Sequence, residues 1–325
     1  MLKLKYLFEN FELAKDCLRL YDADEKRLDK LLNYYRISSN AVYPFRSMST
    51  GRLCFLRLSP VEEKDGQDVL WELRLIQWLV GQGFPAMKPY PMRDGRLFTV
   101  TDTVWGRYNV SCFEAVDGDT LEDCDGSLEL IKGYGRTLGR LHALLKVCPY
   151  KEGRRDHAAL MEEARERFKA YRAPEKLMRE WEAVESELKK LPADKESYGI
   201  VHYDFEADNV LYCDETDTYG VIDFDDAILC WYALDVVRAI DCLGDVAEDI
   251  DAESAKAAFL SGYREETAFT DEQMNSLPLM RRLVRVQAYG TLLHVLSEPA
   301  DTEPDWMTEI IQNLERTLSD IENTL

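Results

Sequence analysis

The sequence has no long apolar run, no paired cysteine motif and no excess of positive charge. Its 325 residues include no stretch long enough to cross a membrane, and the N-terminus, MLKLKYLFENFELAKD, contains acidic residues too early for a secretion signal. The formal net charge of −21 argues against nucleic acid or an anionic membrane as a partner. We therefore expect a cytoplasmic protein that binds neither.

The eight cysteines are scattered singly along the chain, and no C-x-x-C pair occurs among them. Several stand inside apolar segments that are typical of strands. This pattern favours reduced thiols in the core over disulfides or a zinc site.

Basic residues are also absent between Lys195 and Arg238, where eleven acidic residues occur. A metal site would use two or three of these carboxylates. The remainder would attract a cationic substrate, or they would form an acidic surface that keeps the protein soluble. The composition supports both interpretations equally.

The strongest local signal is a hairpin within Gly199–Asp226. Two short apolar strands, Val210–Cys213 and Tyr219–Ile222, flank the polar turn Asp214–Thr218. Antiparallel pairing around this turn predicts that Asn209 faces Asp223 at the open end.

Oxygen ligands should therefore gather at the open end of the hairpin. The loop His202–Asp208 ends there and carries Asp204. An amide oxygen and a carboxylate on a divalent cation, with a second carboxylate left free, suit phosphoryl transfer. The cation neutralises the phosphates, and the free acid receives the proton of the acceptor.

Two ordered motifs resemble the core of the aminoglycoside phosphotransferase and choline kinase superfamily. They are H-x-D-x-x-x-x-N, from His202 through Asp204 to Asn209, and D-F-D, at Asp223–Asp225. The resemblance implies that Asp204 is the catalytic base and that Asn209 and Asp223 bind Mg²⁺. It also implies that His202 packs the loop.

The resemblance further implies an α+β, protein-kinase-like fold of two lobes. Residues 1–115 would form an N-terminal lobe with a helical extension, an antiparallel sheet with a helix, and a loop that covers the nucleotide. Residues 116–325 would form a larger, mostly helical lobe with the catalytic hairpin and the acceptor site. A chain of 325 residues with 46% hydrophobic content is large enough for two lobes.

Arg57 stands inside the apolar strand Leu53–Leu58, where a charge is costly unless it is paired. The next helix runs from Asp68 to about Val80 and carries Glu72 on its flank. We expect Arg57 and Glu72 to meet under the sheet, and the resemblance implies that this pair orients the nucleotide phosphates. The alternative is an outward Arg57 that pairs with a surface acid.

The resemblance places two other nucleotide contacts in the first lobe. The loop Ile37–Asn40 would cover the phosphates, although it lacks glycine, and Ser38 and Ser39 would bind phosphate oxygens there. The backbone around Phe113 and Ala115 would form the hinge that reads the adenine edge.

The remaining segments read as helices of the second lobe. Ser127–Lys146 is amphipathic, 158–191 contains two helices broken at Pro174, and further helices span Ala252–Tyr263, Pro278–Leu296 and Trp306–Leu325. A helix also begins at Ala233, and on it Asp235 is expected to anchor the catalytic loop.

These observations favour an enzyme that moves the γ-phosphate of ATP or GTP to a hydroxyl of a small molecule. Asp225 and Asp226 would contact a second metal ion or a cationic acceptor. Aminoglycosides, choline-like molecules, amino alcohols and sugars all suit the family, and either a monomer or a homodimer is compatible with the sequence.

Two rival interpretations remain. The first is a protein Ser/Thr kinase, although no A-P-E segment or activation loop follows Asp223. The second is a pseudokinase scaffold that binds nucleotide without turnover, although Asp204, Asn209 and Asp223 are all present.

Overall fold

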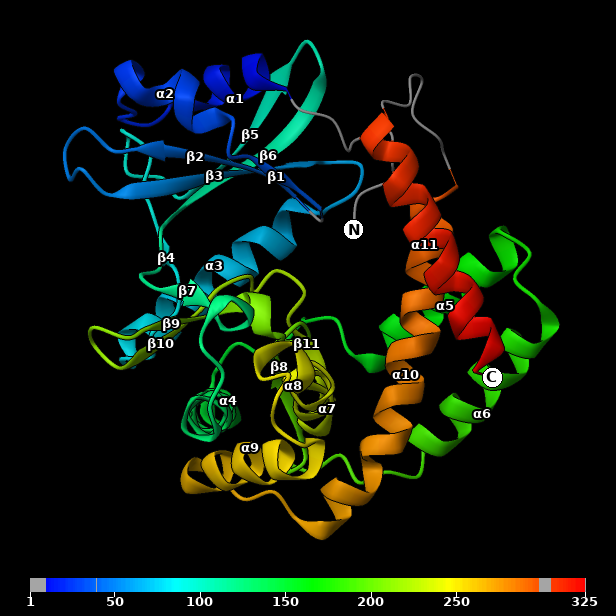
Figure 1. The fold of residues 1–325 in the computed structure, drawn as a ribbon. Coiled ribbons are helices and arrows are strands. Elements are labelled where there is room, and N and C mark those ends of the chain that lie inside the picture. Colours follow the sequence, from blue (N-terminus) through cyan, green and yellow to red (C-terminus); the bar gives the residue numbers. More distant parts are fainter. Residues whose placement is uncertain (1–9, 39, 298–304, 325) are drawn as a thin grey trace.

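The computed structural model describes residues 10–38, 40–297 and 305–324. Ser39 of the expected phosphate loop and the N-terminal residues 1–9 lie outside the described residues. Figure 1 shows a sheet lobe above a mostly helical lobe, with α3 (Gly66–Gly81) running between them. The expected α+β fold with an antiparallel sheet and a larger helical part is confirmed.

The sheet of the first lobe is antiparallel throughout. Its strands follow the order β1 (Arg36–Ile37), β2 (Ala41–Arg46), β3 (Leu53–Pro60), β6 (Gly106–Glu114) and β4 (Lys88–Pro89), and β5 (Phe98–Thr103) also pairs with β6. Because side chains alternate along a strand, Leu56 and Leu58 face one side of the sheet and Arg57 faces the other.

The two faces of the sheet are covered differently. On one face, α1 (Phe11–Leu18) and α2 (Glu25–Leu32) pack over Leu56 and Leu58 and complete a separate apolar core. On the other face lies α3, whose N-terminus is capped by the Asp65 side chain. Alternation thus directs Arg57 toward α3, as the sequence predicts.

The second lobe is built on a close pair of helices, α4 (Leu128–Val147) and α9 (Ala252–Glu266). Glycines lie where the two backbones approach. A Cβ atom added to Gly135 would be 1.9 Å from the carbonyl oxygen of Phe259, and one added to Gly262 would be 1.9 Å from that of Lys132. Only glycine fits at these two positions.

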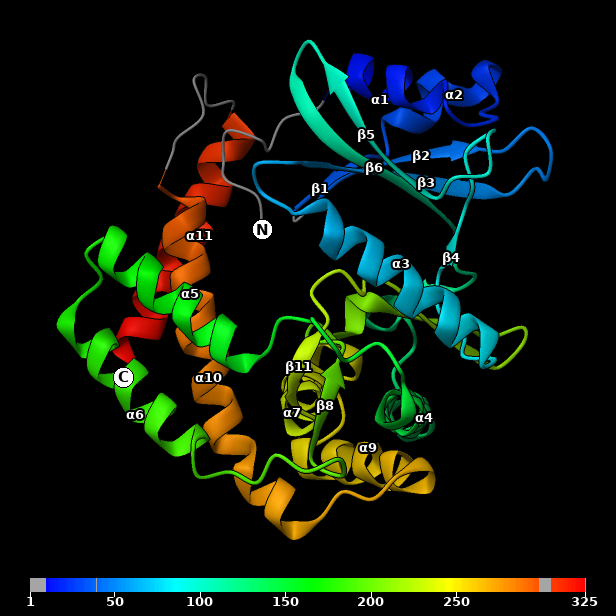
Figure 2. The ribbon, with the colours of Figure 1, turned by 180° about the vertical axis from the view of Figure 1, so that it is seen from behind.

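A second group of helices forms one side of this lobe, seen on the right in Figure 1 and on the left in Figure 2. It contains α5 (His157–Ala170), α6 (Glu175–Leu188), α10 (Asp271–Val295) and α11 (Asp305–Asn323). The helix α10 contacts the other three. It starts at a capping box between Thr270 and Gln273 and passes through Pro278, so the prediction that it starts at Pro278 is wrong by two turns.

Short strands surround the catalytic region in the second lobe. One sheet contains β7 (Asp119–Thr120), β9 (Val210–Cys213) and β10 (Thr218–Val221), and the other pairs β8 (Tyr198–Val201) with β11 (Ile228–Trp231). The connecting helices are η2 (Leu121–Asp123), η3 (Ala207–Asn209), α7 (Ala233–Asp241) and α8 (Leu243–Val246).

The predicted hairpin exists, but its register differs by one residue. Thr218 pairs with Cys213 and Val221 with Val210, because the turn contains one residue fewer than expected. The Ile222 N–H therefore donates to the Asn209 carbonyl over 3.0 Å, and Asp223 is one residue beyond the position facing Asn209. The prediction that Asn209 and Asp223 face each other directly is wrong.

All eight cysteines are free thiols, and five of them are buried, which confirms the expectation from their spacing. Within the part of the chain that the structure describes, no helix is both long and apolar enough to pass through a bilayer.

We predict that Gly135→Ala lowers the free energy of unfolding by about 1–3 kcal/mol, because the added methyl group separates α4 from α9. Gly81→Ala is the matched control, since a Cβ at that helical position meets nothing within 4 Å. It should leave stability unchanged or raise it slightly. Urea denaturation of both variants tests this, and equal stabilities would contradict the packing argument.

Candidate active site

The catalytic loop is fixed by a buried carboxylate on α7. Asp235 has no exposed surface, and its two oxygens accept the backbone N–H groups of His202, over 2.7 Å, and Tyr203, over 2.8 Å. His142 on α4 contacts the same carboxylate, with Nε2 3.0 Å from Oδ2. The sequence-based expectation that Asp235 anchors this loop thus corresponds to two specific hydrogen bonds.

His202 ties the loop to the segment that precedes Asp223. Its buried ring lies 2.9 Å, through Nε2, from the carbonyl oxygen of Ile222, and it packs on Phe205 and Phe224. This is the packing position that the resemblance implies for His202. His202 therefore joins the loop and the D-F-D segment into one packed unit.

Two non-glycine residues of this unit adopt left-handed backbone conformations. Tyr203 has φ of 76° and Asp223 has φ of 62°. Each costs on the order of 1–3 kcal/mol and persists only where surrounding contacts impose it. At Tyr203 the imposing contact is the hydrogen bond to Asp235.

Asp204 follows directly and is held on both sides. Its Oδ2 accepts from the Asn209 amide over 3.0 Å, and its Oδ1 accepts from the Arg238 guanidinium over 3.0 Å. The side chain remains 37% exposed. A carboxylate that is fixed in this way and still accessible can receive a proton from a bound alcohol.

Arg238 was not found by sequence reasoning. It lies on α7, bonds both Asp204 and Glu206, and covers the ring of Tyr203 with its guanidinium 4.7 Å from the ring centroid. Its position in the sequence could have indicated a role in the site. Arg238 is the first Lys or Arg after a long acidic segment, and it follows Asp235 by three residues.

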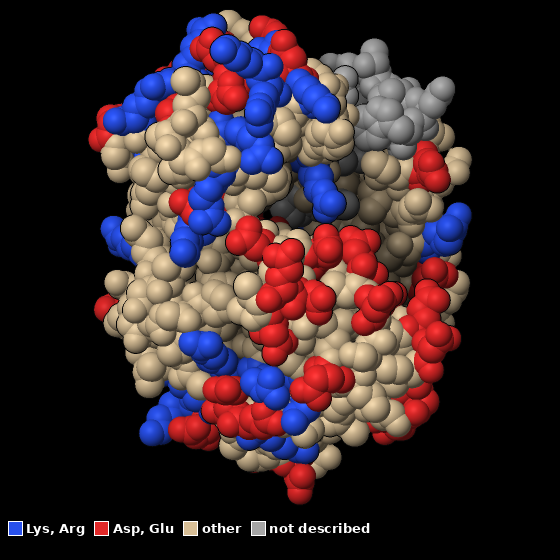
Figure 3. All heavy atoms as spheres, turned by 60° about the vertical axis from the view of Figure 1, so that its left-hand side comes forward, with Lys and Arg blue, Asp and Glu red and all other residues tan. Residues whose placement is uncertain are grey.

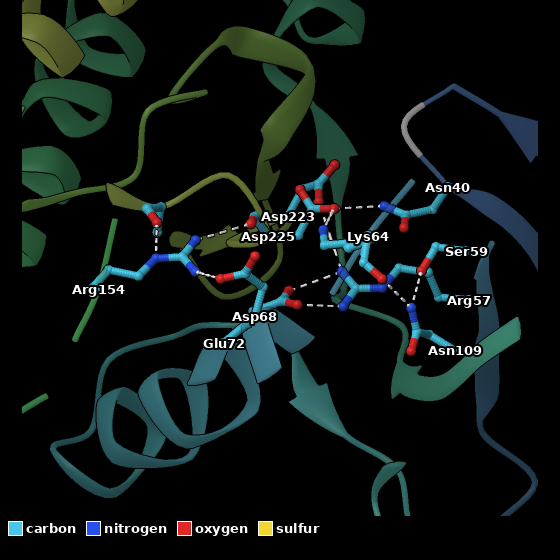
Figure 4. Close-up of polar contacts among 11 residues, drawn as sticks. Asn40, Arg57, Ser59, Lys64, Asp68, Glu72, Asn109, Arg154, Asp223 and Asp225 are labelled. Carbon is cyan, nitrogen blue, oxygen red and sulfur yellow. Dashed lines mark hydrogen bonds and ion pairs between the residues drawn. The ribbon is translucent and has the colours of Figure 1, made fainter. Parts of the chain in front are cut away.

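Arg57 and Glu72 meet under the sheet, as predicted. The guanidinium makes two hydrogen bonds to the Glu72 carboxylate, one of 2.8 Å, and both side chains are buried. Arg57 also lies 3.9 Å from Asp223 and 4.7 Å from the centroid of the Phe113 ring. Figure 4 shows this pair beside the acidic segment. The alternative of an outward Arg57 is excluded.

The structure places two of the other expected nucleotide contacts, Ser38 and Ala115, and their roles stay predictions. Ser38 is exposed, and its N–H donates to the Asn40 carbonyl over 3.1 Å. The Ala115 N–H donates to the Leu53 carbonyl over 2.9 Å, so it is committed within the sheet.

Arg57, Asp204 and Asp223 come together where the two lobes meet. The comparison with known proteins agrees with the motifs that contain them. The phosphotransferase enzyme family matches residues 38–272, which is more than two thirds of the chain and contains the loop, the hairpin and the Arg57–Glu72 pair. The chain belongs to this family. It is a small-molecule phosphotransferase whose acceptor is an alcohol group.

Relatives of this phosphotransferase include antibiotic kinases. Amicoumacin kinase of Bacillus subtilis is 24% identical over 262 residues, covering 78% of this chain and 77% of the relative. A solved amicoumacin kinase complex with AMP-PNP and Ca²⁺ has a TM-score of 0.77 at 19% identity, covering 96% of this chain and 94% of that one. A microcompartment-associated aminopropanol kinase has a TM-score of 0.65 at 19% identity, covering 96% of this chain and 97% of that one. These structures share the fold.

The acidic side chains of the phosphotransferase crowd one another around the D-F-D segment. Loss of water and the charge of Asp225 raise the pKa of Asp223 well above its usual value, and the pKa of Asp226 is raised for the same two reasons. Loss of water would also raise the pKa of Asp225, but Lys64 and Arg57 hold it below its usual value. A cation beside Asp223 would relieve this repulsion.

The residues present fit a divalent cation. Both amide protons of Asn209 point at Asp204, to its carbonyl oxygen over 2.9 Å and its carboxylate over 3.0 Å, which leaves Asn209 Oδ1 for a metal. Mg²⁺ usually takes one or two protein oxygens and completes its shell with phosphates and water. Asn209 and Asp223 would supply those two oxygens.

A cavity of about 450 Å³ opens beside Asp204. Residues of the β3–α3 connection, the catalytic segment, α5 and α10 line it, and they include Lys64, Arg155, Asp204, Asp226, Arg238 and His294. Because this cavity lies next to the accessible carboxylate of Asp204, we propose it as the acceptor cavity.

Acidic side chains also gather outside this cavity. Figure 3 shows them as a band across the middle of one face, below Lys and Arg on the sheet lobe. Burial raises the pKa of Glu122 in η2, and the charges of Asp208, Asp123 and Asp245 raise it further. Asp208 of the catalytic loop therefore lies close enough to Glu122 for their charges to interact.

We predict that Asp235→Ala destabilises the phosphotransferase by about 3 kcal/mol, because two buried N–H groups of the loop lose their acceptor. Asp241→Ala on the same helix is the control. Asp241 is half exposed and pairs with Arg281, so its loss should cost at most about 1 kcal/mol. Guanidinium denaturation compares the two, and equal losses would refute the anchoring role.

Proposed function

We propose that this phosphotransferase moves the γ-phosphate of ATP, with Mg²⁺, to a hydroxyl group of a small amino alcohol or an amine-bearing antibiotic. Asp204 is the catalytic base in this proposal. The observation that carries it is the placement of Asp204, which Arg238 and Asn209 hold at the wall of the acceptor cavity with its carboxylate accessible.

The roles of the other residues follow from their positions. Mg²⁺ on Asn209 and Asp223 supplies charge neutralisation for the phosphates. Arg57, held by Glu72, points at the same acids and orients the phosphates. Asp204 aligns the acceptor hydroxyl and takes its proton as the oxygen bonds to phosphorus.

An acceptor that carries an amine is supported by two observations. Asp226 lines the acceptor cavity, and burial together with the neighbouring charge of Asp225 raises its pKa, so a cationic group beside it would be stabilised. Two relatives are named as kinases of amicoumacin and of aminopropanol. Asp226 is therefore assigned to the acceptor rather than to a second metal.

A small acceptor is also supported by the chain that follows Asp223. It enters β11 at Ile228 and α7 at Ala233, and this leaves no segment on which a protein substrate would lie. This argues against a protein kinase.

The experiment is a phosphate-transfer screen with ATP and GTP against amicoumacin, aminopropanol, aminoglycosides, choline, homoserine and simple sugars. We expect Mg²⁺-dependent transfer from ATP to an amine-bearing alcohol. Transfer only to sugars would refute the acceptor class. Nucleotide binding with no transfer to any member of the panel would favour a scaffold.

We predict that Asp204→Asn lowers kcat about 10²- to 10⁴-fold and leaves nucleotide affinity nearly unchanged, because the amide keeps the shape of the side chain but cannot accept the proton. Asp214→Asn, in the exposed turn of the hairpin, is the matched control and should retain full activity. Steady-state kinetics and calorimetry measure the two quantities. Full activity of Asp204→Asn would remove Asp204 from the mechanism.

A further inference from the structure

A lysine that no motif identifies lies between the two lobes at the active site. Lys64 belongs to the connection between β3 and α3, and its ammonium forms an ion pair with Asp225 of the D-F-D segment. Only 15% of its side chain is exposed. Asn40 donates to the same Asp225 oxygen over 2.7 Å, so two groups of the sheet lobe converge on one carboxylate of the other lobe (Figure 4).

The backbone beneath Lys64 is held firmly. Its N–H donates to the Pro60 carbonyl over 3.1 Å, and its carbonyl accepts from the buried Asn109 amide over 2.8 Å. The next residue, Asp65, caps α3. The ammonium group is therefore presented from a fixed turn that is attached to both the sheet and α3.

The position of Lys64 relative to the two substrates is the decisive observation. Arg57 is paired with Glu72 and lies 3.9 Å from Asp223, one of the two residues that would hold the metal ion. Lys64 lines the acceptor cavity together with Asp204. The phosphoryl group of a nucleotide held at Asn209 and Asp223 would pass to an oxygen beside Asp204, and Lys64 is a cation of the sheet lobe that lines the cavity on the Asp204 side.

The chemistry of the ammonium suits this place. A lysine has three donors and no acceptor, and the ion pair with Asp225 leaves donors for a second partner. During phosphoryl transfer, negative charge is spread over three equatorial oxygens and is stabilised by nearby cations. Asp225 would hold the ammonium in position, since the lysine stem is otherwise flexible.

We propose that Lys64 is a further catalytic residue, which binds the terminal phosphoryl group of the nucleotide and stabilises its charge during transfer. The proposal rests on the proposed function. In the step, the bond from the γ-phosphorus to the bridging oxygen of the nucleoside diphosphate breaks, and a bond from that phosphorus to the acceptor oxygen forms. The acceptor proton goes to Asp204, and Lys64 keeps its protons throughout.

The test compares the affinities of Mg·AMP-PNP and Mg·ADP, because only the first carries the group that Lys64 would bind. Lys64→Gln is the main variant, since its amide can still donate to Asp225 but carries no charge. We expect it to weaken AMP-PNP binding about tenfold to a hundredfold and to change ADP binding less than about twofold. Lys64→Arg should restore most of the difference, and kcat should follow AMP-PNP affinity.

Lys146→Gln is the matched control. Lys146, in the last turn of α4, is similarly buried, with 13% of its side chain exposed, but it pairs with Glu196. This variant should leave both affinities unchanged. Thermal unfolding checks that each variant is folded. If Lys64→Gln is not folded, Lys64→Met takes its place.

Each other outcome has a definite meaning. Equal weakening of both nucleotides would show that Lys64 only spaces the lobes, and unchanged affinities would show no role, so either result overturns the proposal. A wild-type protein that binds neither nucleotide refutes both this inference and the proposed function. A wild-type protein that binds AMP-PNP through Lys64 but phosphorylates no acceptor refutes the proposed function alone.

Discussion

The structure depends on the carboxylate of Asp235, which is fully buried, contacts His142 and accepts two hydrogen bonds from the catalytic loop. A buried acid is tolerated only when donors surround it. Here those donors are the N–H groups of His202 and Tyr203, so the cost of burying Asp235 is offset only if the loop adopts one shape. That shape includes the left-handed Tyr203, and it places Asp204 at the cavity.

The same helix that carries the anchor also carries the group that orients Asp204. Asp235 and Arg238 are three residues apart on α7, so they lie on neighbouring positions of one face. One side chain fixes the backbone of the loop, and the other bonds Asp204 and Glu206. A carboxylate that bonds both Arg238 and Asn209 loses little entropy when an alcohol arrives, which favours alignment of the acceptor.

Local sequence patterns predicted much of the site, but they did not predict the contacts between residues far apart in the sequence. The apolar strand around Arg57 and the helix around Glu72 are local signals, and strand alternation then brings the pair together. The bonds of Asn40 and Lys64 to Asp225 join residues 185 and 161 positions apart, and no local pattern encodes such distances. The predicted hairpin register is wrong by one residue, because a turn sequence rich in Asp and Thr does not specify how many residues the turn contains.

The observed register of the hairpin also sets where Asp223 lies. The ladder ends at the Val210–Val221 pair, and one further hydrogen bond joins the Ile222 N–H to the Asn209 carbonyl, so Asp223 lies beyond the strand and adopts a left-handed conformation. A regular strand would send residues 222 and 223 to opposite faces. The turn at Asp223 breaks this alternation, and the His202 bond to the Ile222 carbonyl holds the break in place. The acid thus owes its position to the loop that Asp235 anchors, and not to the hairpin alone.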